Sequence, residues 1–380
     1  MKRKMIIAAV ALCMFLCVGC EKSEPAYTEV KTELSTFDNK FYYSLLSEEE
    51  KLIYREVYQG IMNLDEEIIV HSLDPDQANG VIDSIMYDFP EIFWIDGSAE
   101  STSYSESLFE VGYTVVDPTY IYTKEDVVSR QHTISLEVER ILGGISAEAT
   151  EYDKIKYVYD YLVDYLEYVD GAPDNQNICS AFIGHETVCA GYAKANQYLL
   201  NEIGIECSYV MGESTDDEGT DSHAWNIVKC NDNYYYVDVT WADPVVEEGS
   251  EILTSERIYD YLLCDETEIA DSHTLEEGYD YPACASNDLN YYRLNQMYYE
   301  AADEDEMLSA MKDSIKAKEA SVTLKFANTD VYAEGSKLLL DELMNEAAQY
   351  LCNYYNLWEV EYYYEENIQC NRFTVYWQYK

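Results

Sequence analysis

The sequence predicts an α+β protein with three folded parts behind an N-terminal leader. Segments with apolar residues at helical spacing carry capping signals, and shorter apolar or alternating runs between them indicate strands. The length of 380 residues leaves room for two or three domains. With 48% hydrophobic and 14% aromatic residues, most of the chain has enough apolar surface to fold.

The chain is strongly acidic, with 74 Asp and Glu residues against 24 Lys and Arg and a formal net charge of -50. Binding a phosphate backbone requires clustered basic residues, so the composition excludes a nucleic-acid partner. Anionic lipid head groups would repel the same surface. Any attachment to a membrane must therefore come from another feature.

Residues 1–20 supply such a feature. The basic stretch Lys2–Lys4 precedes the apolar run Met5–Val18, which is too short to span a bilayer comfortably. The run ends at Gly19-Cys20 and resembles a bacterial lipoprotein signal peptide, although Cys17 stands where Leu is usual. This resemblance implies a diacylated Cys20 and anchoring to the outer face of the cell membrane, with an ordinary secretory signal as the alternative. Residues 21–39 are polar and aperiodic, as expected of a tether.

Of the eleven cysteines, Cys13 and Cys17 would leave with the leader and Cys20 would carry the lipid. None of the other eight lie at CxxC spacing, so no metal site is expected. Whether they form four disulfides or remain free thiols is open. They are Cys179, Cys189, Cys207, Cys230, Cys264, Cys284, Cys352 and Cys370.

Residues 40–122 are predicted to form an N-terminal α+β region without a catalytic grouping. A capping box and an Asp-Pro helix start predict two helices, and two short apolar runs flank a Ser-rich loop. These signals are Ser47 with Glu50, Asp74-Pro75, Ile92–Ile95, Leu108–Val116 and the loop at 97–107.

The next part, residues 123–286, begins with two helices, from Thr123 to Gly143 and from Thr150 through Leu166. Residues 287–380 are predicted to form a small β-α-β-β domain. Its elements are strand Val322–Phe326, helix Ala333–Tyr354, and strands Trp358–Tyr364 and Phe373–Tyr379.

The segment around Cys189 carries the first sign of chemistry. Apolar residues repeat with helical period from Cys189 until Gly204, and Thr187 is a candidate N-cap. Cys189 is therefore expected in a first helical turn, where the helix dipole and free amide groups favour a thiolate. The alternative is that Cys189 is a small buried hydrophobic residue.

Two strand-like runs follow, 222–228 and 234–241, around the turn signal Asn231-Asp232-Asn233. An even-length loop would place His223 opposite Thr240, with Asp238 as its diagonal neighbour on the same face. An odd-length loop would send Asp238 to the opposite face.

A Cys at a helix start, facing a His with an Asp behind it, suits acyl transfer by a thiol. The His takes the thiol proton, the Asp fixes the ring tautomer, and the thiolate attacks a carbonyl. Alone, His223 would be a satisfied core histidine and Asp238 a surface acid. Together with Cys189 they predict a triad. In this triad Asp238→Asn should reduce turnover less than His223→Ala, because Asn can still orient the ring.

The run from Asp174 to Pro244, with TVCAGYAKA, SHAWNIVK and YYYVDVTWADP, resembles the transglutaminase-like superfamily, whose core is a papain-like α+β fold. The resemblance implies that Cys189, His223 and Asp238 form the triad. The Cys189 N–H is the expected oxyanion donor and Gln176 the candidate second donor. One departure is the acidic insertion at 214–221, which could shape the cleft.

The resemblance implies thiol chemistry at an amide or related carbonyl, with no cofactor. Expected substrates are peptides, proteins or cell-wall fragments. Hydrolysis is favoured because crosslinking needs a cleft that excludes water, and nothing in the sequence indicates one. Crosslinking of Gln to Lys, and a non-catalytic extracellular binding or scaffold module, are the alternatives.

Overall fold

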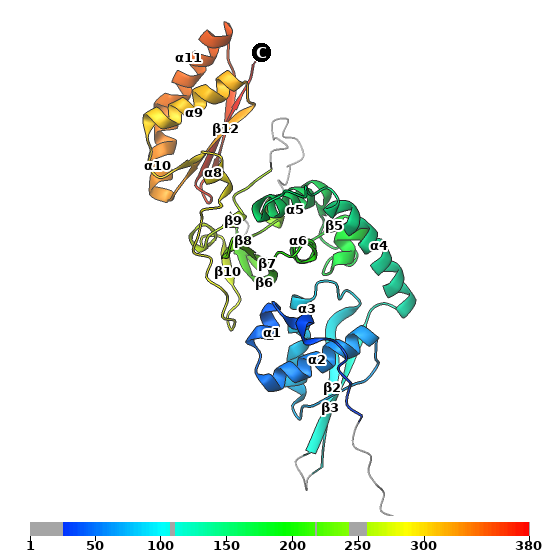
Figure 1. Cartoon of the computed structure of the whole chain (residues 1–380). Coiled ribbons are helices and arrows are strands. Elements are labelled where there is room, and N and C mark those ends of the chain that lie inside the picture. The colour runs from blue at the N-terminus through cyan, green and yellow to red at the C-terminus, as the bar shows by residue number, and fades with distance from the viewer. Residues whose placement is uncertain (1–25, 107–110, 217–218, 243–256, 380) are drawn as a thin grey trace, which may run out of the picture.

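The computed structural model describes residues 26–379 apart from 107–110, 217–218 and 243–256. The leader with Cys20 and the start of the predicted tether lie outside these residues. Figure 1 shows the N-terminal region and the C-terminal domain on opposite sides of the central part. Within the described residues, no helix combines the length and the apolar character needed to cross a membrane.

The N-terminal region packs two longer helices against a three-stranded antiparallel sheet of order β1-β3-β2. The predicted capping box of Ser47 and Glu50 opens α2, and Asp74 caps α3 with Pro75 at its start. The elements are α1 Phe41–Leu45, α2 Glu48–Asn63, β1 Ile68–Val70, α3 Pro75–Asp88, β2 Ile95–Glu106 and β3 Val111–Tyr120.

The predicted Ser-rich loop at 97–107 is wrong, because β2 continues to Glu106 and pairs with β3 from Ala99 onward. Hydroxyl groups bond across this ladder; those of Ser103 and Thr114 are 2.6 Å apart. Strand β2 is rich in Ser and Glu and therefore lacks the apolar signal by which a sequence marks a strand.

The described part of the predicted tether lies against the N-terminal region. The Thr28 N–H donates to Ile69 O in β1 at 3.0 Å. Phe37 ends a 3-10 helix, Leu34–Phe37, and is buried in the core. Main-chain bonding and one buried ring thus join this polar segment to the fold.

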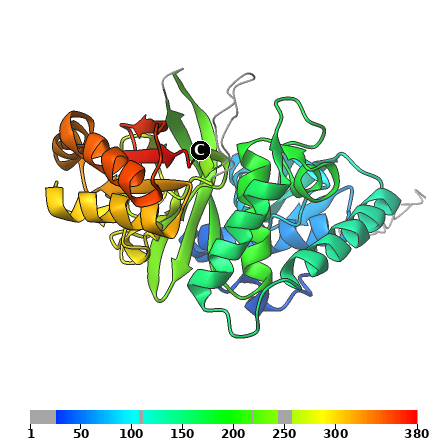
Figure 2. The ribbon, with the colours of Figure 1, turned by 90° about the horizontal axis from the view of Figure 1, so that it is seen from above.

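The central part is a five-stranded antiparallel sheet of order β10-β6-β7-β8-β9. Helix α6 packs on β6 and β7, and α5 packs on α6. Figure 2 shows these light-green strands between the green helices and the orange C-terminal domain. The predicted helices are present as α4 Lys124–Leu142 and α5 Glu151–Tyr165. The others are β4 Glu167–Tyr168, β5 Glu186–Thr187, α6 Cys189–Glu202, β6 Cys207–Thr215, β7 Thr220–Cys230, β8 Asn233–Val237, β9 Leu262–Cys264, α7 Glu266–Ile269, β10 His273–Leu275 and α8 Tyr291–Leu294.

One continuous cluster of buried side chains joins the N-terminal region to the central part. It contains Phe89 and Trp94 from the first, and Leu162, Leu199 and Val228 from the second. Residues 40–122 and 123–286 therefore share a hydrophobic core, which fixes the helices behind the candidate site.

The C-terminal domain has a core of its own. Its four-stranded sheet has the order β11-β12-β14-β13, with β11 and β12 parallel. The predicted long helix starts at Thr329 and has a π-helical segment, Leu339–Leu343, in its middle. The elements are β11 Tyr298–Tyr299, α9 Glu304–Ala317, β12 Ser321–Phe326, α10 Thr329–Leu338, α11 Met344–Tyr355, β13 Tyr362–Asn367 and β14 Arg372–Trp377.

A buried ion cluster holds this domain to the central sheet. Asp260, just before β9, accepts from Lys325 Nζ at 2.9 Å and from Arg372 Nε at 2.8 Å. Next to it, the Tyr261 hydroxyl lies 3.3 Å from the Cys370 thiol. The C-terminal domain thus contacts the strand segment that also borders the candidate site.

Candidate active site

Cys189 is the first residue of α6 and is half-buried. Val188 is the N-cap instead of the predicted Thr187, and its aliphatic side chain caps no amide. The Thr187 hydroxyl bonds to that of Ser180 at 2.6 Å. Because first-turn amides have no intrahelical partner, the Cys189 N–H is left at the helix start.

The β7–β8 hairpin has the even loop on which the predicted register depends. Asn231 and Asp232 are its two turn residues and have positive φ, 49° and 66°. Such a pair is typical of a type I′ turn. The paired ladder ends at Asn226 and Val237, and Thr240 begins the 3-10 helix Thr240–Ala242, so the predicted placing of His223 opposite Thr240 is wrong. Asp238, one residue beyond β8, nevertheless lies beside His223 on β7.

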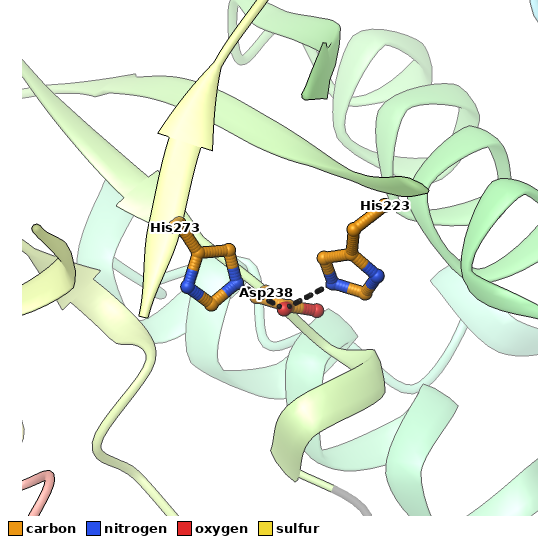
Figure 3. Close-up of side chains that lie close together, drawn as sticks. All are labelled: His223, Asp238 and His273. Carbon is orange, nitrogen blue, oxygen red and sulfur yellow. Dashed lines mark hydrogen bonds and ion pairs between the residues drawn. The ribbon is translucent and has the colours of Figure 1, made fainter. Parts of the chain in front are cut away.

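His223 and Asp238 are directly hydrogen-bonded (Figure 3), with 2.7 Å between His223 Nε2 and Asp238 Oδ2. Their side chains are 6% and 0% exposed. The Asp238 N–H donates to Tyr261 O, and Asp238 Oδ1 accepts from the Thr240 N–H at 2.9 Å. These main-chain contacts fix the carboxylate relative to the imidazole.

The two groups shift each other's pKa in opposite directions. Burial disfavours the imidazolium of His223, but the charge and hydrogen bond of Asp238, followed by a hydrogen bond to Cys189, raise its pKa to about 10. Burial alone would raise the pKa of Asp238, yet the two histidines that bond to it hold that pKa well below its usual range. Both shifts favour an imidazolium beside a carboxylate.

The bond to Asp238 also sets the orientation of the His223 ring. Since Nε2 donates to the carboxylate, Nδ1 is the nitrogen left for a second partner, and Cys189 is near enough to contribute to the raised pKa of this ring. Cys189 also packs near Tyr209 and Ala224. The arrangement can take a proton from a thiol at Nδ1 and return it to a leaving group.

A second histidine, His273, bonds to the same carboxylate oxygen. Its Nε2 lies 3.0 Å from Asp238 Oδ2, and its side chain is 1% exposed. The other ring nitrogen is 2.7 Å from the Ser272 hydroxyl. No sequence spacing indicates this contact, because it depends on β10 pairing with β6 across the sheet, where His273 lies opposite Ser214.

His223, Asp238 and His273 have side chains that can hold a metal ion, and their ligand atoms lie within 4.8 Å of one another. The two N–O distances, 2.7 and 3.0 Å, are those of hydrogen bonds that contain a proton. A zinc ion would lie roughly 2.0–2.2 Å from each ligand and would displace both protons. The three side chains are therefore best described as a hydrogen-bonded network.

Gln176 is exposed, and its side-chain amide donates to Asn175 Oδ1 at 3.2 Å. Its main-chain carbonyl accepts from Lys194 Nζ at 3.1 Å. Lys194 is buried in α6, and burial lowers its pKa to about 8 against the opposing charge of Asp83. Gln176 is thus linked to the helix of Cys189 through its main chain, and its role as a second oxyanion donor stays a prediction.

The acidic insertion at 214–221 forms the tip of the β6–β7 hairpin, although 217–218 lie outside the described residues. The Thr215 N–H donates to Ser272 O at 2.8 Å, and Thr215 O accepts from Gln369 Nε2 at 3.0 Å. The tip is therefore held both by the residue before His273 and by the C-terminal domain.

All eight cysteines in the described part of the chain are free. Six of them are buried, and only Cys189 and Cys352 are half-buried. Cys352 lies in α11 of the C-terminal domain, so Cys189 is the half-buried thiol next to a histidine.

Residues 139–239 match the transglutaminase-like superfamily. One similar solved structure is a TGase with 13% identity and a TM-score of 0.28, covering 50% of this chain and 54% of that one. Another is a candidate cysteine protease from Cytophaga hutchinsonii, with 15% identity and a TM-score of 0.25, covering 38% of this chain and 63% of that one. The chain thus spans less than two thirds of either protein, and at these TM-scores neither bears on substrate or activity. No curated protein matches the chain.

Proposed function

Because residues 139–239 form a domain of the transglutaminase-like superfamily, we propose that this chain is a cysteine-dependent acyl-transfer enzyme that hydrolyses peptide or amide bonds. The observation that carries the proposal is the buried 2.7 Å bond between His223 Nε2 and Asp238 Oδ2. It leaves His223 Nδ1 to Cys189, a half-buried thiol at a helix start.

In the acylation step, the Cys189 thiolate attacks the carbonyl carbon of the substrate. The Cys189 N–H is placed to donate to the oxyanion that forms. The imidazolium of His223 then gives its Nδ1 proton to the leaving nitrogen as the C–N bond breaks. The products are a thioester on Cys189 and a free amine.

In the deacylation step, neutral His223 takes a proton from water while the water oxygen attacks the thioester carbonyl. The C–S bond breaks, the acid leaves, and the thiolate and imidazolium are restored. A primary amine in place of water would give a crosslinked product by the same steps. The choice between water and amine decides between hydrolase and crosslinking enzyme.

The proposal also places the enzyme at the outer face of the cell membrane. The basic and apolar leader and Cys20 support this location, since a lipid on Cys20 would attach a chain whose acidic surface is repelled by anionic head groups. Substrates would then be extracellular peptides, proteins or cell-wall fragments.

An electrophilic probe that mimics a peptide amide tests the enzyme proposal. We expect labelling at Cys189, located by peptide mass spectrometry, and loss of labelling in His223→Ala. Cys352, the other half-buried thiol, serves as the matched control and should stay unlabelled at the same probe concentration. An inert Cys189 in the folded wild type would instead indicate a binding or scaffold module.

A screen of peptide and cell-wall fragments, run with and without a primary amine, then separates the two reactions. Mass spectrometry distinguishes a product that has gained water from one that has gained the amine. We expect hydrolysis products in both conditions, and Cys189→Ala should abolish them. Amine adducts as the main product would identify a crosslinking enzyme.

A further inference from the structure

The carboxylate of Asp238 has more hydrogen-bond donors than a Cys-His-Asp triad needs. Oδ1 accepts from the N–H groups of Thr240 and Trp241, at 2.9 and 3.4 Å. Oδ2 accepts from His223 and also from His273, at 2.7 and 3.0 Å. Figure 3 shows the carboxylate between the two imidazole rings.

We propose that His273 is a positioning residue of this site, which acts through Asp238 and limits how strongly the carboxylate holds the His223 imidazolium. The inference rests on the proposed function, because it assigns His273 a role in that reaction. His273 bonds to Asp238 and Ser272, and Figure 3 shows it on the other side of the carboxylate oxygen from His223.

The surroundings of His273 hold its ring in place. Three aromatic rings lie around it, those of Trp225, Trp241 and Tyr261, with centroid distances of 4.9, 4.8 and 5.5 Å. Burying an imidazole in such a box is costly unless both nitrogens are hydrogen-bonded. Both nitrogens have a partner, because Nε2 bonds to Asp238 Oδ2 and Nδ1 lies 2.7 Å from the Ser272 hydroxyl.

Asp238 Oδ2 accepts from both His223 and His273, so the second hydrogen bond weakens the effect of the carboxylate on His223. A hydrogen bond from His273 draws negative charge away from the bond that Asp238 makes with His223. Without it, the carboxylate would stabilise the imidazolium more strongly, and the pKa of His223, already raised to about 10, would rise further.

That limit matters because His223 has two tasks in the proposed reaction. It must donate a proton as imidazolium during acylation and accept one as neutral imidazole during deacylation. An imidazolium held too tightly is a weaker acid, so it gives its proton poorly to the leaving nitrogen, and the first task suffers. His273 thus favours formation of the acyl intermediate, whereas deacylation, in which His223 acts as the base, does not depend on this limit.

Nuclear magnetic resonance of the full chain with ¹⁵N-labelled histidine tests this inference without any substrate. Only five histidines occur, so each ring signal can be assigned by substitution. We expect the low-field proton of the His223 Nε2–H to move further downfield in His273→Phe, which keeps a ring in the aromatic box but removes the donor. In His273→Gln the amide can replace the Nε2 donor, and the signal should return toward wild type.

His132 is exposed on α4 and serves as the internal control for folding, since its signal should be the same in all three proteins. An unchanged His223 proton in folded His273→Phe would overturn the proposal, as would equal shifts in the Phe and Gln variants. Loss of both Nε2–H signals in wild type, restored by a chelator, would show that the three side chains bind a metal and would also overturn it.

Turnover gives the second measurement. In His273→Phe we expect kcat/KM to fall about tenfold, because it reports acylation, in which the His223 imidazolium must give up its proton. His273→Gln should recover most of kcat/KM. If the His223 proton shifts but Cys189 is unreactive, the hydrogen-bonded network is supported and the proposed enzymatic function is rejected. If the enzyme is active but the proton does not move, only the proposed role of His273 is rejected.

Discussion

Arg372 Nε donates to Asp260 Oδ2 at 2.8 Å, and both side chains are almost completely buried. The bond connects the C-terminal sheet to the residue before Tyr261, whose ring faces His273 at the candidate site. Burial would raise the pKa of Asp260, but the charges of Lys325 and Arg372 lower it, so the acid is ionised. The ionised carboxylate of Asp260, paired with Lys325 and Arg372, therefore attaches the C-terminal domain to the central sheet.

Asp260→Asn should strongly destabilise the folded chain. The substitution leaves Lys325 and Arg372 buried without a full counter-charge, a loss of about 3–5 kcal/mol in comparable pairs. Denaturant unfolding of the wild type and the variant measures the difference. The matched control is Asp313→Asn, which removes an exposed pair with Lys316 and should leave stability close to that of the wild type. Equal effects of the two substitutions would contradict the role of the buried cluster.

Asp238→Asn should reduce turnover about as much as His223→Ala, by about a thousandfold or more. Four N–H donors face the Asp238 carboxylate, whereas an Asn amide has one acceptor oxygen and would turn its NH₂ toward two of them. The sequence predicts a milder loss for Asp238→Asn than for His223→Ala, because it does not reveal these four donors. The control is Asp221→Asn at an exposed acid near His223, which should keep kcat/KM within about twofold. Retention of a tenth of the activity in Asp238→Asn would refute this view of the carboxylate.

The stabilisation that His223 provides should decrease as the pH rises. The pKa of His223 is about 10 in the folded chain, and an unperturbed histidine has a pKa of about 6.5. The folded state thus binds the proton more tightly, and this contribution is complete below about pH 6.5 and lost above about pH 10. The difference in unfolding free energy between wild type and His223→Ala should therefore shrink between these limits. A difference that is constant or grows with pH would show that the pKa is not raised by folding.

Gln176→Ala should lower kcat/KM by less than about tenfold. Removal of an oxyanion donor typically costs about 10²–10³-fold in kcat, but the Gln176 amide is exposed and bonded to Asn175. Lys194→Met should cost more, since it frees the Gln176 carbonyl and leaves the loop before Cys189 less fixed. Steady-state kinetics of both variants provide the test. A hundredfold loss in Gln176→Ala would establish that the amide turns to the substrate during catalysis.

Cys20→Ala should release the protein from membranes, because Cys20 is the residue at which the leader predicts a lipid. Detergent partition of cell extracts measures the effect, with wild type in the detergent phase and the variant in the aqueous phase. Cys17→Ala is the matched control, since Cys17 lies within the apolar run and should not alter partition. Equal partition of wild type and Cys20→Ala would remove the lipid anchor.

The sequence by itself determined the elements whose signals lie close together in the chain. The capping box of Ser47 and Glu50 and the two-residue turn at Asn231-Asp232 are both present in the structure. Each is satisfied by bonds within a few residues, so the local sequence contains the whole cause. The turn matters most, because its even length brings Asp238 beside His223.

Only the tertiary structure determined which third side chain joins the pair of His223 and Asp238. His273 reaches Asp238 from 35 residues away because β10 lies at the edge of the sheet beside β6, and no local pattern specifies that pairing. In the same way Thr187 does not cap α6, because Ser180 bonds to its hydroxyl. Side chains with several possible partners take the one that packing of distant segments brings near, and burial then makes that choice costly to change.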